Sequence, residues 1–180
     1  AQELRKVISK TKPHKREEVI LSYLKDALKE IGGKYVISFK FYKTERRFTS
    51  HFLIFVSKSP LGYSIMKGIM ADFSSHKYQN VATFEYNPHH VDYGFFQPTP
   101  LDELKQDLLS KFSGQSLAVE EIFQSHNIGT PFVESNYKEA LLSLEETNMV
   151  HANPPCDKRQ KRYGRPTLSN NVIITFKEPK

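Results

Sequence analysis

The first part of the chain shows helical and strand-like hydrophobic patterns in turn. Residues 13–30 place apolar side chains at steps of three and four residues, which predicts an amphipathic helix ended by Gly32-Gly33. Residues 34–42 alternate with a period of two, and residues 50–57 form a nearly continuous apolar run. Both segments predict strands, the second buried on both faces. Residues 60–70 predict another helix, so this region is helix–strand–strand–helix.

A two-stranded hairpin with two helices is a thin core for an independent domain. The buried character of residues 52–56 therefore indicates that the hairpin completes a larger sheet, and residues 1–80 resemble the tail of an α/β domain. Residues 81–100 contain three prolines within thirteen positions, with aromatic side chains between them. This composition predicts an ordered connector, and we expect the domain boundary here.

The C-terminal part predicts three helices. Residues 101–112 carry one apolar stripe, and a shorter helix follows over 117–123 with Ser116 as its N-cap. Thr130 and Pro131 then predict the start of a third helix. The buried face of this third helix is expected to consist of Val133, Tyr137, Ala140, Leu141 and Leu144.

A basic segment with a Gly and Pro turn separates two further strand patterns, residues 150–152 and 172–176. Three helices with a short second-to-third turn, followed by a two-stranded wing, predict a winged helix-turn-helix over residues 101–178. The predicted fold class is therefore α+β, with a partial α/β region followed by a C-terminal winged helix.

Charge is distributed unevenly along the chain. The net charge is +6 and the isoelectric point is about 9.3, which permits anionic partners without identifying one. Residues 151–180 carry seven Lys or Arg against two acids, whereas residues 101–150 carry three Lys against nine acids. The positive charge is thus concentrated in the wing, with a smaller excess in residues 1–20.

In a winged helix the third helix normally enters the major groove of DNA and the wing contacts the adjacent backbone. On the third helix, Asn136 is a candidate for reading adenine, and Ser135 and Lys138 are candidates for phosphate contacts. Glu134 and Glu139 beside them disfavour a phosphate-facing helix. The wing is the better candidate, through Lys158, Arg159, Lys161, Arg162, Tyr163 and Arg165. The alternative is a solvated hairpin in a winged helix that pairs with proteins.

The remaining chemistry excludes several classes of site. Cys156 is the single cysteine, so an internal disulfide and a Cys-rich metal site are excluded, and a reducing, cytoplasmic compartment is expected. His89, His90 and Asp92, with His51 or His76, suggest a metal site, but a polar connector is the preferred interpretation.

The sequence contains no phosphate-binding glycine motif, and no set of residues assembles an active site. No cofactor is therefore expected. No apolar run approaches the length of a membrane-spanning helix, so no membrane segment is expected either. The chain begins Ala-Gln-Glu without Met, and we expect it to be a fragment or a processed product.

Two stretches resemble one family, the three-Cys-motif partner proteins (TcmP). The first resembles the family's strand-then-helix segment near the end of its α/β part, and the second resembles its C-terminal winged helix. They are Phe52-Leu53-Ile54-Phe55-Val56-Ser57-Lys58 with the following residues 61–70, and Ile128-Gly129-Thr130-Pro131-Phe132-Val133 with the following residues 136–145. The resemblance runs from about residue 17 to the end.

The resemblance implies an N-terminal Rossmann domain of the methyltransferase type and a partner with a three-Cys, radical-SAM-like motif. Residues 34–57 would then be the last hairpin of the Rossmann sheet. The chain lacks the Gly-rich cofactor turn and the acidic ribose ligand of such domains, so S-adenosylmethionine binding is not carried over.

The sequence thus predicts a non-catalytic nucleic-acid-binding module of a larger TcmP-like protein, with double-stranded DNA as the expected partner. Two alternatives stay open at this point. One is a protein-interaction module in which the acidic residues of 101–150 meet a basic partner. The other is the C-terminal portion of a methyltransferase-like or nuclease enzyme whose catalytic residues lie upstream.

Overall fold

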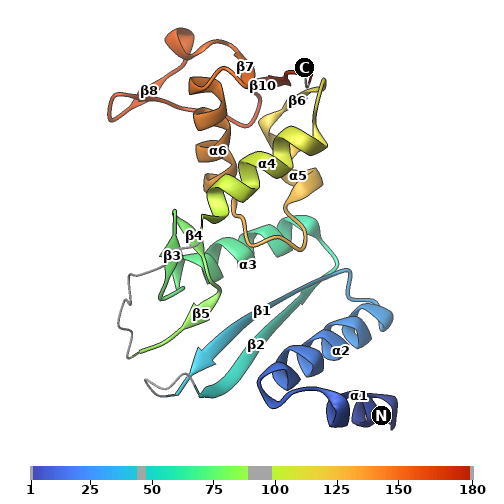
Figure 1. Cartoon of the computed structure of the whole chain (residues 1–180). Helices are drawn as coiled ribbons and strands as arrows, with labels where there is room; N and C mark the ends of the chain where they lie inside the picture. Colours follow the sequence, from blue (N-terminus) through green and yellow to red (C-terminus); the bar gives the residue numbers. More distant parts are fainter. Residues whose placement is uncertain (1, 44–47, 89–98, 179–180) are drawn as a thin grey trace.

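The computed structural model describes residues 2–43, 48–88 and 99–178, and it joins a small sheet with flanking helices to a helical unit that carries the wing (Figure 1). The N-terminal part contains α1 (Gln2–Lys10), a 3-10 turn η1 (Pro13–Lys15), α2 (Arg16–Glu30), β1 (Tyr35–Tyr42), β2 (Thr49–Ser57) and α3 (Pro60–Asp72). Three two-residue strands follow, which are β3 (Lys77–Tyr78), β4 (Val81–Ala82) and β5 (Glu85–Tyr86). None of the helices in the described ranges is long and apolar enough to cross a membrane.

The first sheet has the strand order β2-β1-β5, with β1 antiparallel to β2 and parallel to β5. The period-two pattern of β1 sends Ile37 and Phe39 to one face, where they form a buried cluster with Tyr63 and Met70 of α3. Lys40, on the other face, forms an ion pair with Glu17 of α2 at 2.9 Å. The two helices therefore lie on opposite faces of the hairpin, as Figure 1 shows.

The turn between α2 and β1 depends on Gly33. A Cβ atom there would lie 2.4 Å from the Val56 side chain and 2.7 Å from the Leu28 carbonyl oxygen. Gly32 beside it has φ of +104°, a conformation that side chains disfavour. The pair thus ends the helix, as predicted from the sequence, and lets the chain return close to β2.

The prediction that the second strand is buried on both faces is wrong. Leu53 and Val56 of β2 are 47% and 38% exposed. The reason is that β2 is an edge strand among the described residues, and α3 covers it only in part. The helix α1, which the hydrophobic pattern did not indicate, precedes the predicted elements.

The C-terminal part contains three helices and a sheet in the predicted order. They are α4 (Pro100–Lys111), β6 (Ser116–Ala118), α5 (Val119–His126), α6 (Glu134–Glu146), β7 (Val150–Asn153), the 3-10 turn η2 (Cys156–Lys158), β8 (Lys161–Arg162), β9 (Arg165–Pro166) and β10 (Ile173–Phe176). The helices pack around one apolar core that includes Leu104, Leu108, Ile122 and Ile174, all fully buried. The sheet order is β6-β10-β7.

Two predicted helix starts are wrong. Ser116 does not cap α5, because it lies in β6 and pairs with Thr175 of β10. Thr130 does not cap α6, because its hydroxyl donates to the Asn127 carbonyl oxygen at 3.0 Å. Helix α6 begins at Glu134 instead, where the Asn136 side chain accepts a hydrogen bond from the Val133 N–H at 2.9 Å.

The β3–β4 hairpin packs against the helical unit. Val81 belongs to its apolar core, and the Asn80 carbonyl oxygen accepts a hydrogen bond from the Asn136 side chain at 2.9 Å. The Gln79 side chain accepts from the Leu101 N–H at 2.9 Å, at the start of α4. The domain boundary expected over residues 81–100 stays a prediction. Gln79 and Asn80, which precede this range, already contact the helical unit.

A buried lysine connects α3 to the turn between α5 and α6. The Lys67 ammonium donates to the Asn127 carbonyl oxygen at 2.7 Å and lies 5.7 Å from the centre of the Tyr63 ring. Lys67 is 1% exposed, and this burial lowers its pKa to about 7. No carboxylate in the described ranges forms an ion pair with Lys67.

This pKa makes stability depend on pH. The unfolded lysine, with a pKa of 10.5, holds a proton between about pH 7 and pH 10.5 that the folded protein has largely lost. The free energy of unfolding should therefore rise with pH in this window, by up to about 1.4 kcal/mol per pH unit. The neighbouring His126 and Tyr137 contribute little between pH 7 and pH 9, because burial lowers the pKa of His126 from 6.5 and raises the pKa of Tyr137 from 10.0. Tyr63 behaves like Tyr137, since burial also raises its pKa.

In the Lys67→Met variant we expect the free energy of unfolding to rise less steeply between pH 7 and pH 9. The measurement is denaturant unfolding followed by circular dichroism at several pH values in this range. The Asn127 carbonyl oxygen keeps hydrogen bonds from Thr130 in this variant, so no acceptor is left unpaired. Lys12→Met, at an exposed position, is the matched control and should retain the rise. A wild-type stability that is constant or falls over this window would contradict the prediction.

Candidate nucleic-acid interface

The wing projects from the second sheet and has a cationic tip. Strands β7 and β10 pair antiparallel from Val150↔Phe176 to Asn153↔Ile173, as the sequence predicted. Beyond them β8 and β9 form a smaller hairpin whose two-residue turn is Tyr163-Gly164. Both turn residues have positive φ, of 49° and 80°, as tight hairpins favour. Figure 1 shows this hairpin extending away from the helices.

The tip presents cations that form no ion pair with any described residue. Four bases are exposed, and across the described parts of the chain none of them takes part in an ion pair: Lys158, Lys161, Arg162 and Arg165. The ring of Tyr163 between them is fully exposed. Cys156, at the base of this tip, is an exposed free thiol. The wing thus offers a positive surface with one aromatic side chain at its end.

Arg159 does not belong to this surface, which corrects its place among the predicted contact residues. Its side chain is 3% exposed and forms an ion pair with Glu145 of α6. The Nε and Nη1 atoms are buried and make no hydrogen bond to any described residue. Arg159 therefore fixes the base of the wing to α6 and is not available to a phosphate.

Helix α6 offers less to nucleic acid than the sequence suggested. Asn136 is fully buried, with its amide bonded to Val133 and Asn80, so the expectation that it reads adenine is wrong. Lys138 forms an ion pair with Glu134 at 2.6 Å, which neutralises both charges. Ser135 is exposed at the first turn of the helix. The outer face of α6 thus has no net positive charge.

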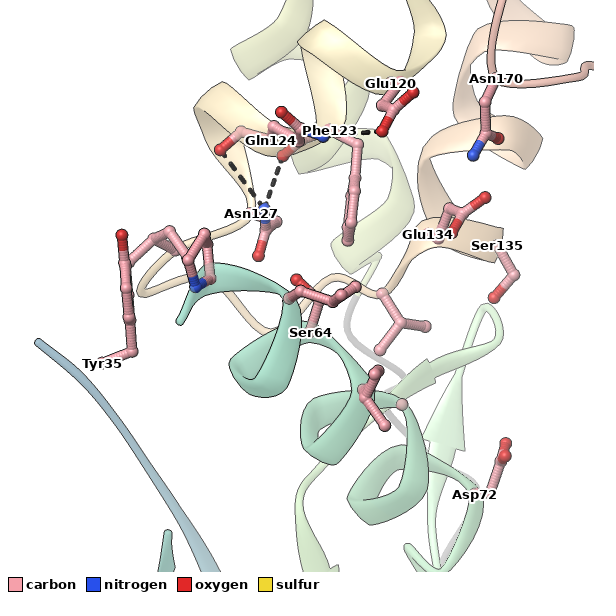
Figure 2. Close-up of a pocket in the computed structure, with 16 residues that line it drawn as sticks. Tyr35, Ser64, Asp72, Glu120, Phe123, Gln124, Asn127, Glu134, Ser135 and Asn170 are labelled. Carbon is pink, nitrogen blue, oxygen red and sulfur yellow. Dashed lines mark hydrogen bonds between the residues drawn. The ribbon is translucent and has the colours of Figure 1, made fainter. Parts of the chain in front are cut away.

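A groove lies at the N-terminal end of α6. It is bounded by α3 on one side and by the α5–α6 turn with the start of α6 on the other, as Figure 2 shows. Its volume is about 700 Å³. Phe123 and Asn127 from α5 and the turn, and Glu134 and Ser135 from α6, line it opposite Ser64 of α3. The end of the helix that would approach DNA therefore faces another part of the same chain.

The metal site that the sequence analysis considered includes His89, His90 and Asp92. These three residues lie outside the described ranges. Of the other two histidines, His51 stacks on Phe41 at 4.5 Å between ring centres, and His76 lies 6.2 Å from Tyr78. Among the residues that the structure describes, no group of three potential ligands surrounds a common point.

Residues 72–155 match the family model described as the GMT-like winged helix-turn-helix domain. The match begins at the end of α3, ahead of the β3–β4 hairpin, and extends through β7. It covers the three helices with β6 and β7, while β10 lies beyond it. The match thus confirms a winged-helix domain in this mixed α+β chain. No curated protein and no solved structure matches the chain.

The Arg159–Glu145 pair yields a prediction about the wing's anchor. Glu145→Met leaves a buried guanidinium without its counter-charge, and we expect a loss of about 3–5 kcal/mol in unfolding free energy. Arg159→Met in the same chain should recover most of this loss, because no uncompensated charge is left.

The measurement is denaturant unfolding of both single variants and of the double variant, read as a double-mutant cycle. Glu146→Met, one residue further and exposed, is the matched control and should cost little. Equal stability losses in the Glu145 variant and the double variant would show that the pair does not act as an anchor.

Proposed function

We propose that the protein is a non-catalytic nucleic-acid-binding module that holds double-stranded DNA mainly through its wing. Winged helices commonly bind DNA, with the wing on the backbone beside the occupied groove. The observation that carries the proposal is the exposed wing, where Tyr163 and four bases that form no ion pair with any described residue lie within residues 158–165. The anchored base of the wing supports it further, because a fixed hairpin loses little conformational freedom on binding.

The same observations favour backbone contacts over base reading. Lysine and arginine on the wing can each neutralise one phosphate, and the Tyr163 hydroxyl can donate to a phosphate oxygen. The outer face of α6 carries the Glu134–Lys138 pair and Glu139, and it has no free base to place beside a phosphate. Sequence preference should therefore be weak, and affinity should depend strongly on salt.

The test is fluorescence anisotropy of a labelled DNA duplex at two salt concentrations. If all four wing bases contact phosphates, the logarithm of the binding constant should fall with the logarithm of salt with a slope of about −3.6. Replacing all four by alanine (Lys158→Ala, Lys161→Ala, Arg162→Ala, Arg165→Ala) should remove most of the affinity and most of this slope.

The matched control removes four exposed bases elsewhere: Arg5→Ala, Lys6→Ala, Lys10→Ala and Lys12→Ala. It changes the net charge equally, so it separates a wing contact from a general charge effect. An affinity that neither salt nor the wing substitutions change would contradict the proposal. Equal losses in the two variants would contradict the wing as the site.

We also propose the finer family assignment that the sequence suggested. In this proposal the chain is TcmP-like, and β1–β2 is the last hairpin of a methyltransferase-type sheet. The exposed edge strand β2, with Leu53 and Val56 partly uncovered, supports a further strand beside it. The family match covers residues 72–155, so β1 and β2 lie outside it. The three-Cys-motif partner and the cytoplasmic location stay predictions.

A further inference from the structure

The groove between α3 and the α5–α6 turn has an apolar floor. Leu61 and Ile65 of α3 lie one helical turn apart and are 68% and 57% exposed. Ile128 of the turn also lines the groove and is 43% exposed. These three side chains leave apolar surface open to water inside a concave site, which is typical of surfaces that bind a partner.

Every charged residue that lines the groove is acidic. Asp72 stands at the end of α3, Glu120 on α5 and Glu134 on α6. Glu134 forms an ion pair with Lys138, and Asp72 forms one with Lys77 at 3.8 Å. Glu120 forms no ion pair within the described ranges and accepts a hydrogen bond from the Gln124 amide at 2.8 Å. Among the described residues the rim therefore carries one charge without an ion-pair partner, at Glu120, and this charge is negative.

The walls of the groove are held together by contacts beneath its floor. The Lys67 ammonium reaches the Asn127 carbonyl oxygen at 2.7 Å, and the Tyr63 hydroxyl accepts a hydrogen bond from the Gly129 N–H at 3.4 Å. Both bonds cross from α3 to the turn. The groove is therefore formed before any ligand arrives, which lowers the cost of binding.

We propose that this groove binds a basic amphipathic helical segment of a partner protein. Apolar side chains at positions i, i+3 or i+4 and i+7 of that segment lie against Leu61, Ile65 and Ile128, in the helix-in-groove mode. Lysine or arginine on its flanks meets Glu120, whose carboxylate forms no ion pair in the described parts of the chain. Nucleic acid does not fit, because its phosphates would meet carboxylates on an apolar floor.

The test is selection of a random-peptide phage library on the whole chain, followed by affinity measurement with the enriched peptides. The enriched sequences should combine Lys or Arg with Leu, Ile or Phe at helical spacing. Ile65→Asp and Glu120→Lys should each weaken these peptides by about tenfold or more. Because both residues are exposed, neither change removes a buried contact.

Two matched variants control for the character of the substitutions. Ile31→Asp places the same change at a side chain that is 83% exposed and outside the groove, and Glu146→Lys reverses an exposed charge outside it. Both should keep peptide affinity within about twofold. Duplex DNA affinity should be unchanged by Ile65→Asp, which separates this proposal from the one for the wing.

Three outcomes would overturn the proposal. They are the enrichment of acidic peptides or of none, peptide binding that both groove variants leave intact, and a loss of duplex DNA affinity in Ile65→Asp. The last result would assign the groove to the nucleic-acid interface instead.

Discussion

The burial of α6 is the constraint from which both proposed surfaces follow. Tyr137, Ala140 and Leu141 are fully buried between α4, α5 and the wing sheet, and the β3–β4 hairpin covers Asn136 from a further side. A helix enclosed this way keeps only a narrow outer stripe. On that stripe Glu134 and Lys138 neutralise each other in an ion pair, so the exposed positive charge of the domain lies on the wing.

The wing in turn takes its position from α6. A guanidinium is costly to remove from water, so Arg159 is stable in the interior only where Glu145 compensates its charge. This requirement limits the wing to arrangements in which residue 159 reaches the last turn of α6. Leu168, buried in the same core, fixes the returning segment. The small hairpin beyond them is held at both of its ends.

The sequence predicted the parts of the fold that depend on local periodicity. The apolar repeats located α2, α3, α4 and α6, and the alternation of residues 34–42 located β1. What it missed depends on contacts far along the chain. The two-residue strands β3 and β4 are too short to show a period, and Thr130-Pro131 has the chemistry of a helix start that the Asn127 contact overrides. Arg159 is one of several adjacent bases, and no local signal separates it from its exposed neighbours.

The opposite charges of the two proposed surfaces suit a chain that holds two kinds of partner at once. Residues 151–180 have a net charge of +5, from seven bases and two acids. Residues 101–150 have a net charge of −6, from three bases and nine acids. The Glu120 carboxylate on the rim of the groove repels phosphate, while the bases on the wing attract it. Screening in physiological salt limits such fields to roughly 8 Å, so each surface acts on what touches it. A nucleic acid bound to the wing would therefore not weaken the binding of a basic segment in the groove through its charge.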